Sequence, residues 1–418
     1  MTADAVLPAL IGLPMLAALL AILAPRAGVL LAVAAGWANA GLVAAAWPHL
    51  GAVSQLGGWA PPLGIALRLD GLALPFLGLT ATVMALTATA TAARATLAAP
   101  GAATLWLFLL AGLNACFLAA DLFTLYIALE VLSLAAVALT ALGGLKAAEP
   151  ALRYLFVSLG GSLLYLMGVA LLYRAGGALD MRLLAGAGLS GPAMAVPLAL
   201  ATLGLLMKAG AAPFHFWLPP AHGAAAPAVS AVLSGVVVKA ALYLILRLWT
   251  EVAPGASLAS AEPVFRALGL VALGLGALGA LGSTQLKALI ANSTVAQIGY
   301  VLLALGFAAE TPQAVRAAVA FVLAHGLAKA AIFGAAGLLR DANGHDRLAE
   351  LQDPGPRLGP AKGAIALGTM ALMGLPPSGG FLAKWALAEA ALMRAQWWMA
   401  PVLGAGAVLT GAYMLRLV

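Results

Sequence analysis

Long apolar runs, separated by short polar connections, extend along the whole chain. We predict about 13 membrane-crossing helices from them, because about 20 mostly apolar residues span the hydrocarbon layer as a helix. The runs lie at 6–24, 28–47, 70–92, 104–119, 122–142, 152–174, 193–213, 226–249, 264–282, 290–308, 314–339, 362–394 (interrupted) and 399–417. They are continuous rather than alternating, which argues against a membrane β-barrel. The predicted class is an all-α polytopic membrane protein without a separate soluble domain.

The composition supports this class. Of the 418 residues, 64% are hydrophobic and only 8% are charged, and the mean hydropathy is +1.06. A soluble domain could not bury so much apolar surface. Cys116 is the only cysteine, which argues against disulfides and thiolate-bound clusters. The net charge of +7 lies mostly in short connections, as is typical of contacts with lipid headgroups rather than with nucleic acid.

The basic residues in alternating connections indicate the orientation in the membrane. Ten Lys and Arg residues fall on one side and seven on the other, which favours an external N-terminus and a cytoplasmic segment 340–361. This segment is the longest polar insertion, and we expect a surface loop with a short interfacial helix there. The run 6–24 has no basic stretch before it, so we expect an ordinary first span rather than a cleaved signal peptide.

Two runs contain helix-breaking sequences, AAPFHFWLPP at 211–220 and GLPPSGG at 374–380. The prolines expected to break the helices are Pro213, Pro219, Pro376 and Pro377. Paired broken helices in transporters mark inverted repeats around a central pathway. We therefore expect a three-helix segment at 1–100, followed by five-helix repeats at 101–250 and 260–418, each with one broken helix.

The lysines are placed unusually deep in the apolar runs. Of the seven lysines, Lys287 lies at the edge of a run and four lie inside: Lys208, Lys239, Lys329 and Lys384. A structural cation is more naturally an arginine, whereas burial lowers the pKa of a lysine and lets it release a proton. Lys208 precedes the first break and Lys384 follows the second, as repeats of opposite orientation require. One such lysine could be a snorkelling anchor, but four together favour proton transport.

Two further groups complete the predicted polar path. Glu130, in DLFTLYIALEVLSL (121–134), is the one carboxylate near the middle of a run, and we expect it to pair with Lys208. His325 and Lys329 are four residues apart, so they share a helix face and could line one hydrated path. Glu389 is a weaker second acid, equally suited to the headgroup region.

These residues resemble a known family. The run KAGAAPFHFWLPPAHGAAAPAVSAVLSGVVVKAALYLILRL (208–248) is similar to the signature of antiporter-like membrane subunits. Such subunits occur in respiratory complex I, in Mrp-type cation/proton antiporters and in membrane-bound hydrogenases. The resemblance covers roughly 100–395 and continues in three further motifs. These are LKALIANSTVAQIGY (286–300), HGLAKAAIFGAAGLL (325–339) and GLPPSGGFLAKW (374–385).

The resemblance implies a role for each polar residue in proton transfer along a hydrated axis in the membrane plane. Glu130 matches the carboxylate of the family's fifth helix, and Lys208 the lysine before the break in its seventh. Lys239 matches the connecting lysine of the eighth helix. His325 and Lys329 match axis positions of the eleventh, and Lys384 matches the exit residue of the twelfth. Two departures are Gln285, where the family often has an acid, and one core helix fewer than usual.

The leading hypothesis is a proton-translocating subunit of a multi-subunit, energy-coupling membrane complex, either like NADH:quinone oxidoreductase and hydrogenase or like the Mrp complex. Its expected partners are other membrane subunits, protons and the lipid bilayer of a bacterial or archaeal inner (plasma) membrane. No cofactor, metal site or redox centre is expected in this chain. One alternative is a D-type subunit of an Mrp antiporter, which would depend on Na⁺. Others are a non-conducting structural anchor and a haem-binding oxidoreductase with His215, His222 or His325 as axial ligands.

Overall fold

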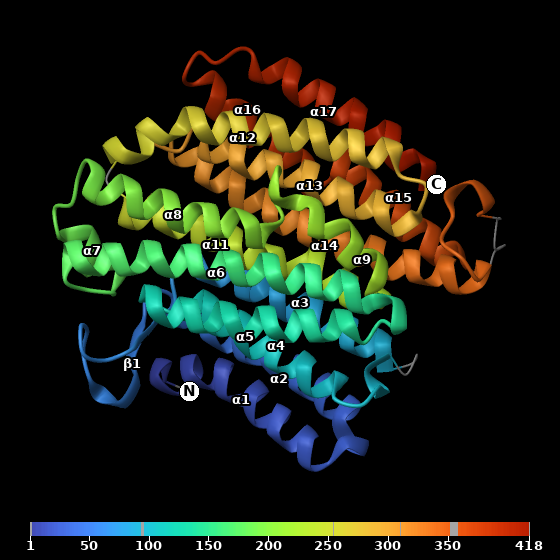
Figure 1. Ribbon diagram of the computed structural model, residues 1–418, viewed down its shortest axis with the longest axis horizontal. Helices are drawn as coiled ribbons and strands as arrows, with labels where there is room; N and C mark the ends of the chain where they lie inside the picture. The colour runs from blue at the N-terminus through green and yellow to red at the C-terminus, as the bar shows by residue number, and fades with distance from the viewer. Residues whose placement is uncertain (1, 93–95, 254, 310, 352–357, 418) are drawn as a thin grey trace. The chain divides into compact units, whose positions relative to one another are not determined.

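The computed structural model describes residues 2–92, 96–253, 255–309, 311–351 and 358–417. Eleven helical segments in this part of the chain are long and apolar enough to cross a membrane. Helix α4 (Ala102–Leu118) is shorter, and α15 (Gly359–Met373) and α16 (Gly379–Leu392) lie on either side of a break. Each apolar run therefore corresponds to a helix or a helix pair (Figure 1). The all-helical polytopic class is confirmed.

The chain divides into two units. Unit 1 comprises Met1–Ala209 and Val236–Pro254, and unit 2 comprises Gly210–Gly235 and Gly255–Val418. The main helices of unit 1 are α1 (Ala3–Leu23), α2 (Gly28–Ala46), α3 (Ala73–Ala92), α4, α5 (Leu122–Ala141), α6 (Ala148–Gly176), α7 (Met181–Gly186), α8 (Pro192–Ala209) and α11 (Val238–Arg247). Those of unit 2 are α9 (Leu218–Ala224), α10 (Pro227–Val232), α12 (Gly255–Gly282), α13 (Leu286–Leu305), α14 (Pro312–Asn343), α15, α16 and α17 (Met399–Met414).

A small β-hairpin between α2 and α3 was not predicted. Strands β1 (Val53–Gln55) and β2 (Ala66–Arg68) pair antiparallel, with Val53 opposite Arg68 and Gln55 opposite Ala66 (Figure 1). Three-residue strands are too short for an alternating pattern to stand out in a sequence. The hairpin is relevant to the polar contacts of unit 1 because it ends in Arg68.

Each helix break combines a left-handed glycine with proline. Helix α8 ends at Ala209, Gly210 has φ +64°, the Ala212–Pro213 peptide is cis, and α9 carries Pro219 in its first turn. At the second break, Gly374 has φ +80° and the Pro376–Pro377 peptide is cis. Proline cannot donate a backbone hydrogen bond and clashes with the preceding turn, so neither helix continues through its break.

The segment 340–361 connects two helices, and its ends belong to them: α14 continues to Asn343 and α15 begins at Gly359. Between them the described residues contain the 3₁₀ turn Leu348–Glu350. Residues 352–357 lie outside the described part of the chain. Helix α12 also begins earlier than predicted, at Gly255, because the two turns before the apolar run, which contain Ser257, Ser260 and Glu262, are helical as well.

Helices α6 and α8 of unit 1 lie side by side (Figure 1) and approach closely at glycines. A Cβ on Gly204 of α8 would lie 2.8 Å from the amide nitrogen of Tyr165, and a Cβ on Gly168 of α6 would lie 2.5 Å from the carbonyl oxygen of Pro197. Small residues let helix backbones pack closely where lipid provides no hydrophobic drive. This contact sets the spacing of the two helices that carry Lys208 and its partner Ser158.

We expect Gly204→Ala to destabilise the protein by about 1–3 kcal/mol, because the new methyl group overlaps backbone atoms of α6. The matched control is Gly41→Ala in α2, where a Cβ meets nothing within 4 Å. Both changes gain the same helix propensity, so the difference isolates the clash. Unfolding in detergent measures it, and equal stability of the two variants would contradict the close contact.

Candidate proton-transfer site

Lys208 forms the centre of a buried polar cluster in unit 1. Its ammonium lies 3.1 Å from Glu130 Oε1, 2.9 Å from Ser133 Oγ and 3.0 Å from Ser158 Oγ. The first two partners come from α5 and the third from α6. Ser162 Oγ also contacts Glu130 Oε1, and it lies 3.0 Å from the Ser158 carbonyl oxygen. The pairing of Glu130 with Lys208 matches the expectation from the sequence.

The cluster satisfies all three N–H donors of the Lys208 ammonium. The Lys208 side chain is 4% exposed and that of Glu130 is 19% exposed, so the pair is shielded from water on the lysine side. A carboxylate and two hydroxyls can hold the charged lysine, and the hydroxyls can reorient as acceptors or donors when its proton leaves. The arrangement is therefore suited to reversible protonation as well as to structural pairing.

Lys239 lies on α11, also in unit 1, and is 1% exposed. Wide π-helical turns flank α11 on both sides, at Leu233–Val237 and Leu248–Val252. Such turns are rare and often occur at functional sites. Tyr243 and Arg247 follow Lys239 at intervals of four residues, so the three share one face of α11.

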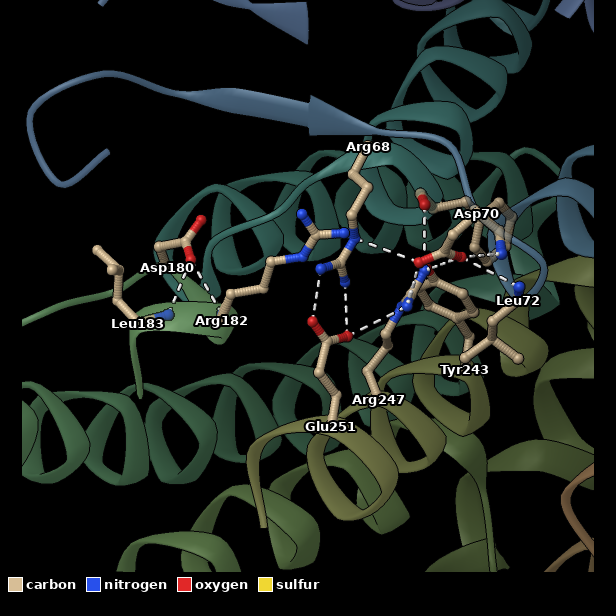
Figure 2. A network of polar contacts seen from close by, with 11 residues as sticks. Arg68, Asp70, Leu72, Asp180, Arg182, Leu183, Tyr243, Arg247 and Glu251 are labelled. Carbon is tan, nitrogen blue, oxygen red and sulfur yellow. Dashed lines mark hydrogen bonds and ion pairs between the residues drawn. The ribbon is translucent and has the colours of Figure 1, made fainter. Parts of the chain in front are cut away.

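A network of four charged residues lies at the far end of this face (Figure 2). Arg68 contacts both carboxylate oxygens of Glu251 at 2.5 Å, and Arg247 contacts both oxygens of Asp70 at 2.6 Å. Arg247 also reaches Glu251 at 3.2 Å and donates to the Tyr243 hydroxyl at 2.8 Å. Paired, planar contacts of this kind are strong and fix orientation.

The burial of Arg68 and Arg247 was not predicted. The sequence analysis counted both among the seven basic residues of one side, and the structure shows them to be 4% and 6% exposed. Their partners are up to 183 positions away in the chain, which no local pattern could reveal. The spacing of four between Arg247 and Glu251 on one helix was the one available signal.

Asp70 joins the network to the start of α3. Its Oδ1 accepts hydrogen bonds from the amides of Leu72 and Ala73, both at 3.0 Å. Burial alone would raise the pKa of Asp70. The hydrogen bonds and charge of Arg247, the Ala73 amide and the charge of Arg68 outweigh burial and hold this pKa below its usual value.

Unit 2 contains three buried lysines that contact mostly neutral oxygen atoms. Lys287 donates to the carbonyls of His222 at 3.1 Å, Gly223 at 3.2 Å and Ala225, around the C-terminal end of α9. Lys329 donates to the Ile290 carbonyl at 2.6 Å and contacts Ser293 Oγ. Sequence reasoning placed Lys287 only at the edge of a span, but it is 2% exposed.

Lys384 is held directly by the second break. It donates to the carbonyls of Leu372 at 3.0 Å and Met373 at 2.8 Å, which are left free where α15 ends. Its ammonium also lies over the ring of Tyr300, 4.6 Å from the centroid. Glu389 accepts a hydrogen bond from Trp385 instead of contacting this lysine.

His222 and His325, two histidines of unit 2, lie against aromatic rings. His325 is 4% exposed, and its ring stacks on Phe321 at 6.3 Å between centroids. The buried His222 ring stacks on Phe333 at 4.6 Å. His215 lies in the 3₁₀ turn after the first break and is half-buried.

A buried carboxylate near the start of α12 was missed by the sequence analysis. Glu262 lies on α12, is 2% exposed, and pairs with Arg394 at 2.6 Å. It also accepts a hydrogen bond from the Ala309 amide at 2.9 Å. The predicted run began at 264, which left Glu262 outside the predicted helix.

Comparisons with known proteins place the chain in a family. The family described as NADH:quinone oxidoreductase/Mrp antiporter, transmembrane, matches residues 119–410. The chain therefore belongs to this family of antiporter-like membrane subunits. The match contains both breaks and all six residues predicted from the sequence to carry protons.

Two curated relatives represent the two named branches. The N-type subunit of NADH-quinone oxidoreductase from Desulforudis audaxviator (strain MP104C) is 32% identical over 371 residues, which cover 86% of this chain and 73% of that protein. The D-type subunit of the Na(+)/H(+) antiporter from Alkalihalophilus pseudofirmus is 31% identical over 324 residues, or 75% of this chain and 64% of that protein.

Two solved structures share the fold. A chain in the Mrp complex from Dietzia sp. DQ12-45-1b superposes with a TM-score of 0.93 at 29% identity, covering 100% of this chain and 80% of that chain. A chain in the membrane-bound sulfane sulfur reductase, an archaeal respiratory membrane complex, gives 0.89 at 28% identity, with coverages of 99% and 87%. Both neighbours are subunits of multi-subunit membrane complexes.

The charge network of Figure 2 predicts a pH-dependent contribution to stability. Because the folded pKa of Asp70 is lowered, its stabilisation is present above the unfolded pKa of about 3.9 and is lost as the pH falls through the folded value. We expect Asp70→Asn to unfold at a lower temperature than wild type at pH 7, with the difference shrinking below about pH 4.

The matched control is Asp341→Asn, which removes the 2.9 Å contact of an exposed pair with Arg340 and should change the unfolding temperature little. Thermal unfolding in detergent across this pH range measures both variants. A constant difference between Asp70→Asn and wild type at all pH values would contradict the proposed role of the charge.

Proposed function

We propose that the chain is a proton-translocating subunit of a multi-subunit, energy-coupling membrane complex. A proton enters near Lys239, is held on Lys208, and exchanges along His325 and Lys329 to Lys384. Glu130 sets the affinity of Lys208 for the proton through its charge. The observation that carries this proposal is the buried Lys208–Glu130 pair with its serine hydroxyls. A purely structural cation would not need such a reversible set of partners.

The fold supports a repeat architecture for this function. We propose thirteen crossings, made of the eleven long segments, α4, and the pair α15–α16 around the second break. The five-helix repeats would span 101–250 and 260–418 after the three helices of 1–100. The N-terminus would face outward in a bacterial or archaeal plasma membrane. Each repeat would then contain one broken helix with a lysine beside it.

A second candidate is the D-type subunit of an Mrp Na⁺/H⁺ antiporter. The extent of the match to a chain of the Dietzia Mrp complex favours it. Of the two curated relatives, the NADH-quinone oxidoreductase subunit from Desulforudis audaxviator matches over 371 residues and the Na(+)/H(+) antiporter subunit over 324. This difference instead favours a redox-driven complex. The two candidates share the same proton path in this chain. They differ in whether sodium ions are required.

The alternatives from other classes have weaker support. A haem-binding oxidoreductase needs two histidines at matching depth on facing helices, whereas His215 and His222 lie at the first helix break and His325 lies one turn from Lys329. An absorbance spectrum of the purified chain tests it, because a Soret band would favour haem. Burying the ammonium groups of Lys208, Lys329 and Lys384 costs free energy of folding. A non-conducting anchor would gain no function in return for this cost.

We expect Lys208→Ala to abolish or greatly reduce proton uptake into vesicles that contain the intact complex, because it removes the proton carrier. Lys146→Ala is the matched control, since Lys146 is exposed in the turn Leu145–Ala147. Uptake is measured with and without sodium, after verifying assembly. A requirement for sodium favours the antiporter candidate, and sodium-independent uptake favours a redox-driven complex. Normal uptake in an assembled Lys208→Ala complex would refute the proposed path.

A further inference from the structure

An open cavity of about 430 Å³ lies on the surface of unit 1, between the last turns of α6 and the first turns of α8. This volume is within the range of small-molecule binding sites. Arg174 is the only charged residue of the lining, and the other six lining residues are apolar, among them Leu171 of α6 and Val196 of α8. None of the residues proposed to carry protons lines this cavity, so it is separate from the candidate site described above.

The cavity begins where the close contact between α6 and α8 ends. A Cβ on Gly168 would lie 2.5 Å from the carbonyl oxygen of Pro197, so the two helices touch at this level. Pro197 also lines the cavity, together with Pro192 in the first turn of α8. Both walls are therefore helices that their own packing holds together.

Arg174 is exposed and forms no ion pair with an acid in the described part of the chain. The buried arginines Arg68 and Arg247, by contrast, each contact a carboxylate. No lining residue of the cavity is acidic. The guanidinium of Arg174 can therefore bind a phosphate through paired hydrogen bonds, whereas an ammonium group attached to that phosphate would find no carboxylate in the lining. The charge of the cavity favours an anionic ligand over a zwitterionic one.

The cavity continues an exposed apolar stripe on α6. Leu163 and Met167 are exposed, and Leu171 of the cavity lining follows at the same interval of four residues. This spacing places all three on one face of the helix. In a membrane subunit such a face lies against lipid chains. Tyr173, exposed beside Arg174, is a residue typical of the headgroup level, so the cavity lies where lipid chains and headgroups meet.

The dimensions of the stripe fit one leaflet of a bilayer. Because a helix rises about 1.5 Å per residue, Met167 lies about 10 Å and Leu163 about 16 Å from Arg174 along α6. Half of the hydrocarbon layer is about 15 Å thick. An acyl chain that is attached to a phosphate at Arg174 would therefore follow the stripe past Met167 as far as Leu163.

We propose that this cavity binds one anionic phospholipid, with its phosphate on Arg174 and an acyl chain along Leu171, Met167 and Leu163. The charge of the arginine selects the headgroup, and the apolar walls hold the start of the chain. Binding at this place does not depend on proton transfer. The lipid joins α6 to α8, the two helices that contribute Lys208 and one of its serine partners.

Native mass spectrometry of the purified full chain, stripped of lipid in detergent, measures this binding. We expect wild type to bind phosphatidylglycerol more tightly than phosphatidylethanolamine with the same acyl chains. Arg174→Gln should weaken phosphatidylglycerol binding about tenfold and reduce this preference, because a charge-assisted hydrogen bond to phosphate is lost. Val196→Trp, which fills the cavity and keeps the arginine, should weaken the binding of both lipids. Both positions are exposed, so neither change should prevent folding.

The matched controls are Arg316→Gln in α14 and Val408→Trp in α17. Both residues are exposed, neither lines the cavity, and Arg316 forms no ion pair within the described residues. Both control variants should bind phosphatidylglycerol as wild type does. Equal binding by the two arginine variants would overturn the proposal, and so would equal binding by the two tryptophan variants, since either result places the lipid elsewhere. If one cavity variant does not fold, the other pair decides.

Discussion

A charge inside the hydrocarbon layer must find its partners within the protein, since lipid offers none. The structure meets this constraint by two means. Lys208 has a carboxylate and two serine hydroxyls on neighbouring helices. Lys287 and Lys384 instead use backbone carbonyls that become free where helices end, at α9 and α15. The helix breaks therefore provide ligands for ammonium groups as well as interruptions in the fold.

The difference between Lys208 and Lys384 has a physical consequence. A carboxylate competes strongly for an ammonium and holds it charged, whereas a ring face and carbonyl dipoles stabilise it less. In the proposed path, Lys208 would therefore hold its proton more firmly than Lys384 would.

The sequence predicted what local patterns encode. Apolar runs located the helices, prolines located the breaks, and the scarcity of acids in the runs identified Glu130 as the partner of Lys208. The hairpin was missed because its strands are only three residues long. The Arg68–Glu251 and Glu262–Arg394 pairs were missed because their members are 183 and 132 positions apart. Such pairs are set by how helices pack, which hydrophobic periodicity does not specify.

Two buried arginines and three buried lysines occupy different surroundings, and this supports different roles for them. The buried arginines Arg68 and Arg247 contact carboxylates through paired, short hydrogen bonds. Because a guanidinium does not lose its proton, these cations stay charged, and their contacts fix the hairpin and the start of α3 to the end of α11. The lysines Lys287, Lys329 and Lys384 contact neutral oxygens, which tolerate either protonation state. A chain that needed only anchors would have no reason to separate its cations in this way, whereas a proton carrier requires a rigid frame of fixed charges around sites whose charge can change.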